Sequence, residues 1–153
     1  MKNRMLVALL IEYRRAMLPL KSILSNLSES QFLEVRDFNS SDPDCKSIAT
    51  VINHCVHSGY LYASYLDTIT KDSTWIEYEM TINNPIEAIK ELDKMVDYTE
   101  AILKKISHLT DKELNMHQLK ARWGVTFDVE QLLEHAIVHI LRHRLQIENF
   151  LKA

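Results

Sequence analysis

The sequence predicts an all-α protein folded as a single four-helix bundle that spans residues 1–153. Only two glycines and three prolines occur in 153 residues, which is few for a chain built from short strands and tight turns. Hydrophobic residues make up 46% of the chain, enough for one substantial core without a second domain. Four segments carry apolar residues at intervals of three and four, and four such amphipathic helices bury their apolar faces together in a bundle.

The first predicted helix covers residues 3–24 and is followed by a long connection, residues 25–46. Pro19 lies inside the helix and lacks a backbone donor, so we expect a kink or an interruption there. In the connection, Ser28 is followed three residues later by Gln31, which resembles a capping box and predicts a short turn. The predicted apolar stripe of the helix is Leu6, Leu9, Leu10, Tyr13, Met17, Leu20 and Leu24. The connection is long enough for a crossover.

The second predicted helix begins after a cap at Asp44 or Ser47. Residues 71–83 follow it as a linker. We expect Trp75 and Tyr78 in this linker to cover the core, and a lid over a pocket is the alternative. The apolar side of the helix carries Ile48, Val51, Ile52, Cys55, Tyr62, Leu66 and Ile69.

The third predicted helix begins at Asn84, where Pro85 takes the first helical position, and continues to about Ile106. A second cap, Asp128 with Gln131 three residues later, predicts the start of the last helix. The inward side of the third helix is predicted to carry Ile86, Ile89, Leu92, Val96, one of Tyr98 and Thr99, Ile102 and Leu103. Its predicted solvated face carries Glu87, Glu91, Asp93, Lys94, Lys104 and Lys105.

The last predicted helix, residues 128–151, carries a histidine at every fourth position: His135, His139 and His143. At roughly 100° per residue, His143 lies about 20° from Ala136 in the middle of the buried face, His139 about 60° and His135 about 100°. Two histidines four apart can bind one metal ion. The three together span about 12 Å along the axis, too far for a single ion, so a third ligand must come from another helix.

The second helix offers two further histidines, His54 and His57. Relative to Val51 on its apolar side, His54 lies about 60° away and His57 about 120° away. The wheel therefore favours His54 as the inward residue. The remaining histidines, His108 and His117, have no spacing that indicates a metal site.

The histidine pattern resembles the DinB/YfiT-like family of metalloenzymes. The run Leu133-x-His135-x-x-x-His139-x-x-x-His143-Arg144-x-Gln146-Ile147 is similar to the last helix of that family, which supplies two metal-binding histidines four apart, while the second helix supplies a third. The resemblance implies that His54, His139 and His143 bind the metal and that the bundle runs up-down-down-up. The sequence departs from the family at Leu145, where glycine is common, which can alter packing or access beside the site.

Three imidazoles without a fourth protein ligand leave a coordination position for water or substrate, as in catalytic sites. Zinc or nickel is the expected ion, while iron and manganese remain alternatives because imidazole discriminates weakly among metals. The resemblance implies a metal-dependent transferase or hydrolase that acts on a small molecule, with a low-molecular-weight thiol as a further cofactor. The alternative is a noncatalytic metal-binding bundle for stress response or sensing. An open metal position beside a pocket favours the enzyme, and a sealed site favours the alternative.

Two other catalytic centres are disfavoured by spacing. A di-iron bundle needs Glu-x-x-His pairs, and no histidine here has glutamate three residues before it. His54 and Cys55 are adjacent in a helix and diverge by about 100°, so adjacency does not make them a catalytic dyad. Cys55 is expected to be a small core residue.

Charge and cysteine usage bound the partners and the compartment. The net charge of −3 and the absence of a long basic tract argue against nucleic acid as a partner. Cys45 and Cys55 form no disulfide pattern, and the apolar run at residues 5–11 is too short for a membrane span and lacks an export signal, so we expect a cytoplasmic protein. A homodimer is also expected, from the habit of the family and from Trp75 and Tyr78 as exposed aromatic candidates.

Overall fold

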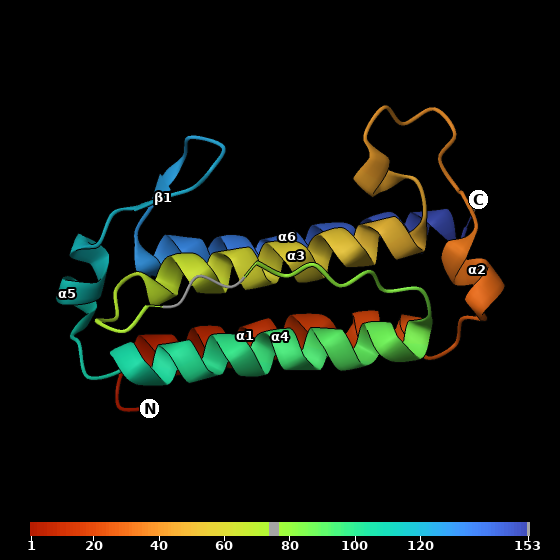
Figure 1. Ribbon diagram of the computed structural model, residues 1–153. Coiled ribbons are helices and arrows are strands. Elements are labelled where there is room, and N and C mark those ends of the chain that lie inside the picture. Colours follow the sequence, from red (N-terminus) through yellow and green to blue (C-terminus); the bar gives the residue numbers. More distant parts are fainter. Residues whose placement is uncertain (74–76, 153) are drawn as a thin grey trace.

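The computed structural model describes residues 1–73 and 77–152 and confirms the all-helical fold (Figure 1). Trp75 lies outside the described residues. The four long helices are α1 (Arg4–Leu24), α3 (Ile48–Asp67), α4 (Pro85–Ile106) and α6 (Val129–Phe150). The shorter elements are α2 (Glu29–Leu33), the 3₁₀ helix η1 (Pro43–Cys45), α5 (Asp111–Met116), β1 (Leu119–Lys120) and β2 (Thr126–Phe127).

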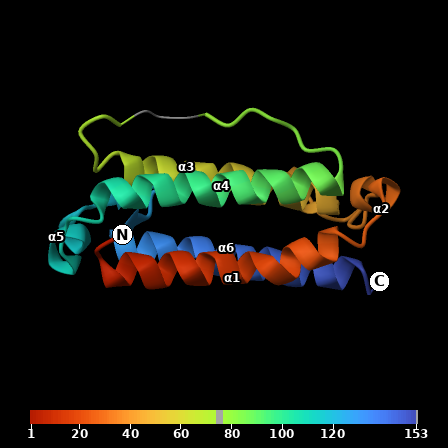
Figure 2. The ribbon, with the colours of Figure 1, turned by 90° about the horizontal axis from the view of Figure 1, so that it is seen from below.

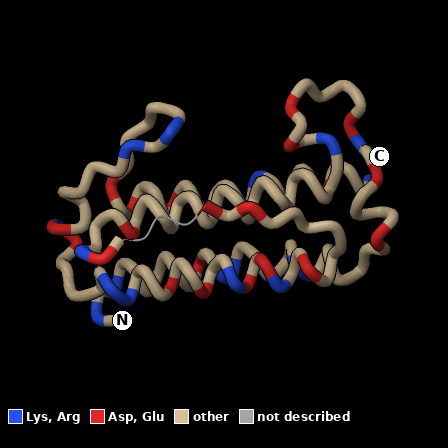
Figure 3. The backbone as a smooth tube through the Cα atoms, in the orientation of Figure 1, with Lys and Arg blue, Asp and Glu red and all other residues tan. Residues whose placement is uncertain are grey.

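The long helices lie in two pairs, with α1 and α6 running in one direction and α3 and α4 in the other (Figure 2). Ion pairs reflect the opposed directions of α1 and α4, because Arg14 lies 2.8 Å from Asp97 whereas Lys21, later in α1, lies 2.7 Å from Asp93, earlier in α4. Figure 3 shows acidic and basic residues interspersed along this pair of helices. The chain order is thus up-down-down-up. No helix within the described residues has the length and hydrophobicity needed to cross a membrane.

The connection between α3 and α4 returns along the bundle, which lets two consecutive helices run parallel. Asn53 holds the end of this connection through two hydrogen bonds with the backbone of Ile82, each 2.9 Å long. Tyr78 stacks on Tyr60 with ring centroids 4.6 Å apart, and its hydroxyl donates to Glu91 at 3.0 Å. Tyr78 therefore covers the helices, which agrees with the prediction that the linker covers the core.

Glu91 corrects the prediction that every charged residue of the third helix faces solvent. Its exposed fraction is only 3%, because residues of the returning connection cover it. The carboxylate accepts from Tyr78 and lies 2.6 Å from Lys94 Nζ, so the buried charge has both a hydrogen-bond donor and a cation. The prediction for Ile86 is also wrong, because this residue is predicted to face inward but is 68% exposed.

The caps of the helices are confirmed where side-chain oxygens precede an apolar stripe. Ser47, rather than Asp44, caps α3, and it forms a capping box with Thr50. Asn84 caps α4 by accepting from the backbone of Glu87. The predicted boxes Ser28 with Gln31 and Asp128 with Gln131 open α2 and α6. Asp44 instead lies in η1, one turn before α3, and its carboxylate contacts His54 rather than the helix backbone.

The predicted interruption at Pro19 is wrong, because α1 continues through it to Leu24, while the alternative of a kink stays a prediction. Proline removes one helical hydrogen bond, but its ring lies on the exposed side of α1. Leu20 and Leu24, on the opposite side, are fully buried and hold the last turns against the core. Packing of the apolar face thus outweighs the missing donor.

Two elements were missed between the third and last helices. Thr110 and Glu113 form a capping box that opens α5, and this sequence pattern could have predicted the helix. The hairpin of β1 and β2 has only two residues in each strand, too short for a periodicity. Gly124 turns this hairpin with φ of 89°, a conformation that favours glycine.

Gly59 allows α3 and α4 to approach closely. A Cβ at this position would lie 1.9 Å from Met95 Sδ, and Met95 is fully buried. Overpacking of a core costs about 1–3 kcal/mol, whereas alanine gains about 0.5–1 kcal/mol over glycine in a helix. The contact with Met95 therefore decides whether alanine at position 59 lowers or raises the free energy of unfolding.

We expect Gly59→Ala to lower the free energy of unfolding by about 1 kcal/mol, because the overpacking exceeds the gain in helix propensity. In a Met95→Ala background, the same substitution should raise it by about 0.5–1 kcal/mol, since the obstructing side chain is gone. Urea denaturation of the wild type, both single variants and the double variant measures the two effects. Equal effects of Gly59→Ala in both backgrounds would contradict the proposed contact.

Candidate metal centre

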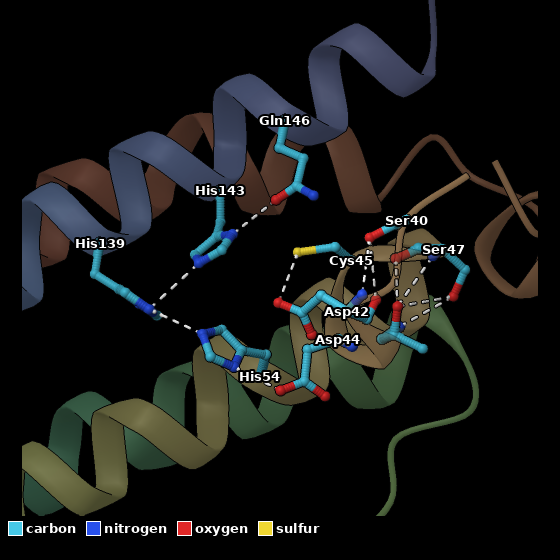
Figure 4. Close-up of polar contacts among 10 residues, drawn as sticks. Ser40, Asp42, Asp44, Cys45, Ser47, His54, His139, His143 and Gln146 are labelled. Carbon is cyan, nitrogen blue, oxygen red and sulfur yellow. Dashed lines mark hydrogen bonds and ion pairs between the residues drawn. The ribbon is translucent and has the colours of Figure 1, made fainter. Parts of the chain in front are cut away.

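Three histidines from two helices meet between α3 and α6. Figure 4 shows His54 of α3 and His139 and His143 of α6 with their rings directed toward one another. His54 Nε2 lies 3.1 Å from His139 Nε2, which in turn lies 3.3 Å from His143 Nε2. Within the described part of the chain, these three form the one group of His, Cys, Asp or Glu whose donor atoms all lie within 4.8 Å of one another.

The spacing of the nitrogens suits a divalent metal ion. Two imidazole nitrogens bound tetrahedrally at about 2.0–2.1 Å from an ion lie about 3.3 Å apart. The distances of 3.1 and 3.3 Å are close to this value, and all three donor atoms lie within 4.8 Å of one another. No fourth histidine, cysteine or carboxylate from the described residues joins the group.

Hydrogen bonds behind two of the rings set the proton positions. His54 Nδ1 lies 3.0 Å from the carboxylate of Asp44, which can only accept, so Nδ1 carries the proton. His143 Nδ1 lies 2.9 Å from Gln146 Oε1, and the same argument places its proton on Nδ1. Both rings therefore direct Nε2 lone pairs toward His139.

These two lone pairs meet a single atom, His139 Nε2. If this nitrogen carries a proton, it can donate fully to only one of the two facing lone pairs, and if it does not, three lone pairs converge. A cation accepts all three. The arrangement of His54, His139 and His143 is thus incomplete as a hydrogen-bonded cluster, and a metal ion could bind all three lone pairs.

Burial favours the neutral form of His139 and His143, the form that binds metals. Burial, reinforced by His143, His54 and Arg142, lowers the pKa of His139 to about 2. Burial also lowers the pKa of His143, although Gln146 opposes the shift. His139 and His143 are both 5% exposed, so both face inward as predicted, but His143 is not the more buried of the two.

A pocket of about 350 Å³ lies on one side of the three histidines. His54 and His139 form part of its wall, so the ligands themselves border the cavity. The other residues of the wall are Ser58, Leu61, Tyr62, Trp123, His135 and Arg142. The site is therefore open to a small molecule from this side.

His135 and His57 lie outside the metal cluster. His135 belongs to the pocket wall, where it stacks on Trp123 and its Nε2 lies 3.3 Å from the hydroxyl of Tyr62. His57 is exposed, and its Nε2 donates to the carbonyl oxygen of Met80 at 3.1 Å. Cys55 is 1% exposed in the core, where burial raises the pKa of its thiol.

Sequence reasoning missed three residues of this region. Asp44 was considered only as a helix cap, because nothing in its spacing connects it with a histidine ten residues later. Arg142 and Trp123 line the pocket without belonging to a motif. A charged residue beside the histidine run of the last helix was the one visible sign for Arg142.

Comparison with protein families gives one assignment. Residues 19–153 match the model of the DinB family, which covers all three clustered histidines. Comparisons with curated proteins and with solved structures find no match.

We expect His54→Ala, His139→Ala and His143→Ala each to abolish stoichiometric binding of Zn²⁺ or Ni²⁺, because each removes one of three ligands. His57→Ala and His135→Ala should retain near-native metal content, since neither ring reaches the cluster. Calorimetric metal titration of tag-free protein measures stoichiometry and affinity. Full stoichiometry with unchanged affinity in His143→Ala would overturn the assignment.

The same titration separates ligands from the residues that orient them. Asp44→Ala and Gln146→Ala should preserve stoichiometry but weaken affinity by about 10–100-fold, the usual effect of losing a hydrogen bond to a ligating histidine. Wild-type affinity in Asp44→Ala would show that His54 is held by its packing alone.

We expect metal-free protein to lose stability as the pH falls from 7 to 5. The folded pKa of His139 lies below its ordinary value of 6.5, so the unfolded chain takes up this proton first. The stabilising contribution is fully present above the unfolded pKa, falls by about 2 kcal/mol by pH 5 and continues to fall toward the folded pKa. Urea denaturation at each pH should show a smaller loss in His139→Gln, while His57→Gln, the matched control, keeps the wild-type loss. Identical pH dependence in His139→Gln and the wild type would refute this origin.

Proposed function

Because the chain belongs to the DinB family and brings three imidazoles together beside a pocket, we propose that it is a metal-dependent enzyme with a three-histidine divalent metal site. His54, His139 and His143 hold the ion, with zinc or nickel as the best-suited metals. The reaction is transfer or hydrolysis on a small molecule, with a low-molecular-weight thiol or water as the nucleophile.

The observation that carries this proposal is the one-sided environment of the cluster. On the side of η1, Asp44 supports His54, and Gln146 supports His143 within α6 (Figure 4). On the other side, the described residues place a cavity of about 350 Å³ instead of a fourth ligand. A purely structural site is closed by protein ligands, whereas a catalytic site keeps a position for water or substrate. The open side therefore favours an enzyme over a noncatalytic sensing bundle.

A bound divalent ion supplies a Lewis acid that makes a water or thiol acidic near neutral pH. The chain supplies orientation and a place for the released proton. His135 borders the pocket without being a ligand, and burial followed by Arg142 lowers its pKa, so its ring is a neutral proton acceptor near pH 7. Burial raises the pKa of the neighbouring Tyr62 to about 12, so this hydroxyl stays protonated and can orient His135.

Metal-dependent turnover tests the proposal. Zinc- or nickel-loaded protein should accelerate one of two reactions. The first is the reaction of 1-chloro-2,4-dinitrobenzene with a thiol, for which cysteine, glutathione and coenzyme A are tested. The second is the hydrolysis of 4-nitrophenyl acetate. Metal removal and His143→Ala should return the rate to that without protein, whereas His57→Ala should keep it. Two results would count against the enzyme. One is an X-ray absorption spectrum that shows four protein ligands on the bound ion, and the other is an activity that survives metal removal.

A further inference from the structure

The wall of the metal-site pocket contains a cation and no carboxylate. Of the described residues that line it, Arg142 is the one arginine or lysine, and none is an aspartate or glutamate. Asp44, the acidic residue bound to His54, does not border this cavity. A divalent ion on the histidines would add to the positive charge. The pocket therefore attracts anions.

Among the described residues, the guanidinium of Arg142 has no carboxylate partner, a property that it shares with Arg4, which does not line this pocket. Five others form ion pairs within the described residues: Arg14, Arg15, Arg36, Arg122 and Arg144. For Arg142, no carboxylate of the described chain lies within ion-pair distance, although Glu148 on the same helix pairs with Arg144. A guanidinium presents paired donors that match a carboxylate or a phosphate. Arg142 is thus free to bind an anion in the pocket.

Another part of the pocket wall, around Trp123, is flat and apolar. Trp123 remains 46% exposed, and it stacks on His135 with ring centroids 5.9 Å apart and an angle of 29° between planes. Tyr62 meets Trp123 edge-on, with centroids 6.1 Å apart, and Leu61 completes this part of the wall. An exposed indole held in place by neighbouring rings is a surface for a planar organic group.

We propose that the pocket binds a small aromatic carboxylate, with its anionic group on Arg142 and its ring against Trp123. This inference rests on the proposed function in that it names the substrate class of the same site. The apolar wall favours an aromatic carboxylate over inorganic phosphate, because phosphate would pair with Arg142 but make no contact with the ring of Trp123. The volume of about 350 Å³ lies at the lower end of ligand pockets, which suits a single substituted ring.

Calorimetric titration of zinc-loaded protein with benzoate, benzamide and inorganic phosphate tests the inference. Benzoate should bind at least about tenfold more tightly than benzamide, its uncharged analogue, because only benzoate forms the charge-assisted pair. Arg142→Gln should remove this preference and Arg142→Lys should retain part of it. Trp123→Ala should weaken benzoate and benzamide alike. Arg15→Gln, which removes the same charge from the exposed surface of α1, should leave all affinities unchanged.

Several outcomes would overturn the substrate class: equal binding of benzoate and benzamide, no binding of either, phosphate binding as tight as benzoate, or an unchanged preference in Arg142→Gln. The same titration of metal-free protein separates this inference from the proposed enzyme. A preference for benzoate that depends on Arg142 and persists without metal supports the pocket even if no metal-dependent turnover exists. Turnover without that preference leaves the enzyme and removes the aromatic carboxylate.

Discussion

The convergence of three imidazoles between α3 and α6 is the constraint on which the site depends. A charge on His139 or His143 would be buried, so burial lowers the pKa of both and keeps them neutral, with their lone pairs directed inward. Protons are held on the outer nitrogens by Asp44 and Gln146. The cluster is thereby prepared for a cation before any cation arrives, and the apolar packing of both helices holds the geometry.

The long connections make this convergence compatible with the rest of the bundle. The segment between α1 and α3 folds into α2 and η1, and Phe32 of α2 is fully buried where it anchors the crossover. The crossover delivers Asp44 to the outer side of His54. The segment between α3 and α4 returns along the helices and is fastened by Asn53 and Tyr78. Irregular chain therefore both permits the helix order and supplies a partner of a ligand.

The two sides of the cluster differ in a way that matches their separate tasks. The supporting side holds polar side chains at hydrogen-bond distance, which fixes the ligands (Figure 4). The open side holds aromatic rings and Arg142 around a cavity. The hairpin of β1 and β2 carries Trp123 to this side, so an element of only two residues per strand determines the shape of the pocket. The residues of the pocket wall can thus change while the three histidines stay in place.

The sequence by itself determined the four helices, the caps at Asn84 and Asp128, and the position of His139 and His143 further inward than His135, because these depend on periodicity and on contacts within a few residues. Preference for His54 over His57 also followed from one helix wheel, and resemblance to a family joined it to His139 and His143. Only the tertiary structure decided that Asp44 supports His54, that Glu91 is buried beneath Tyr78 and that α1 continues through Pro19. Each of these depends on packing between segments distant in the chain. Local pattern determines which face of a helix is apolar, but only the assembled bundle determines what that face meets.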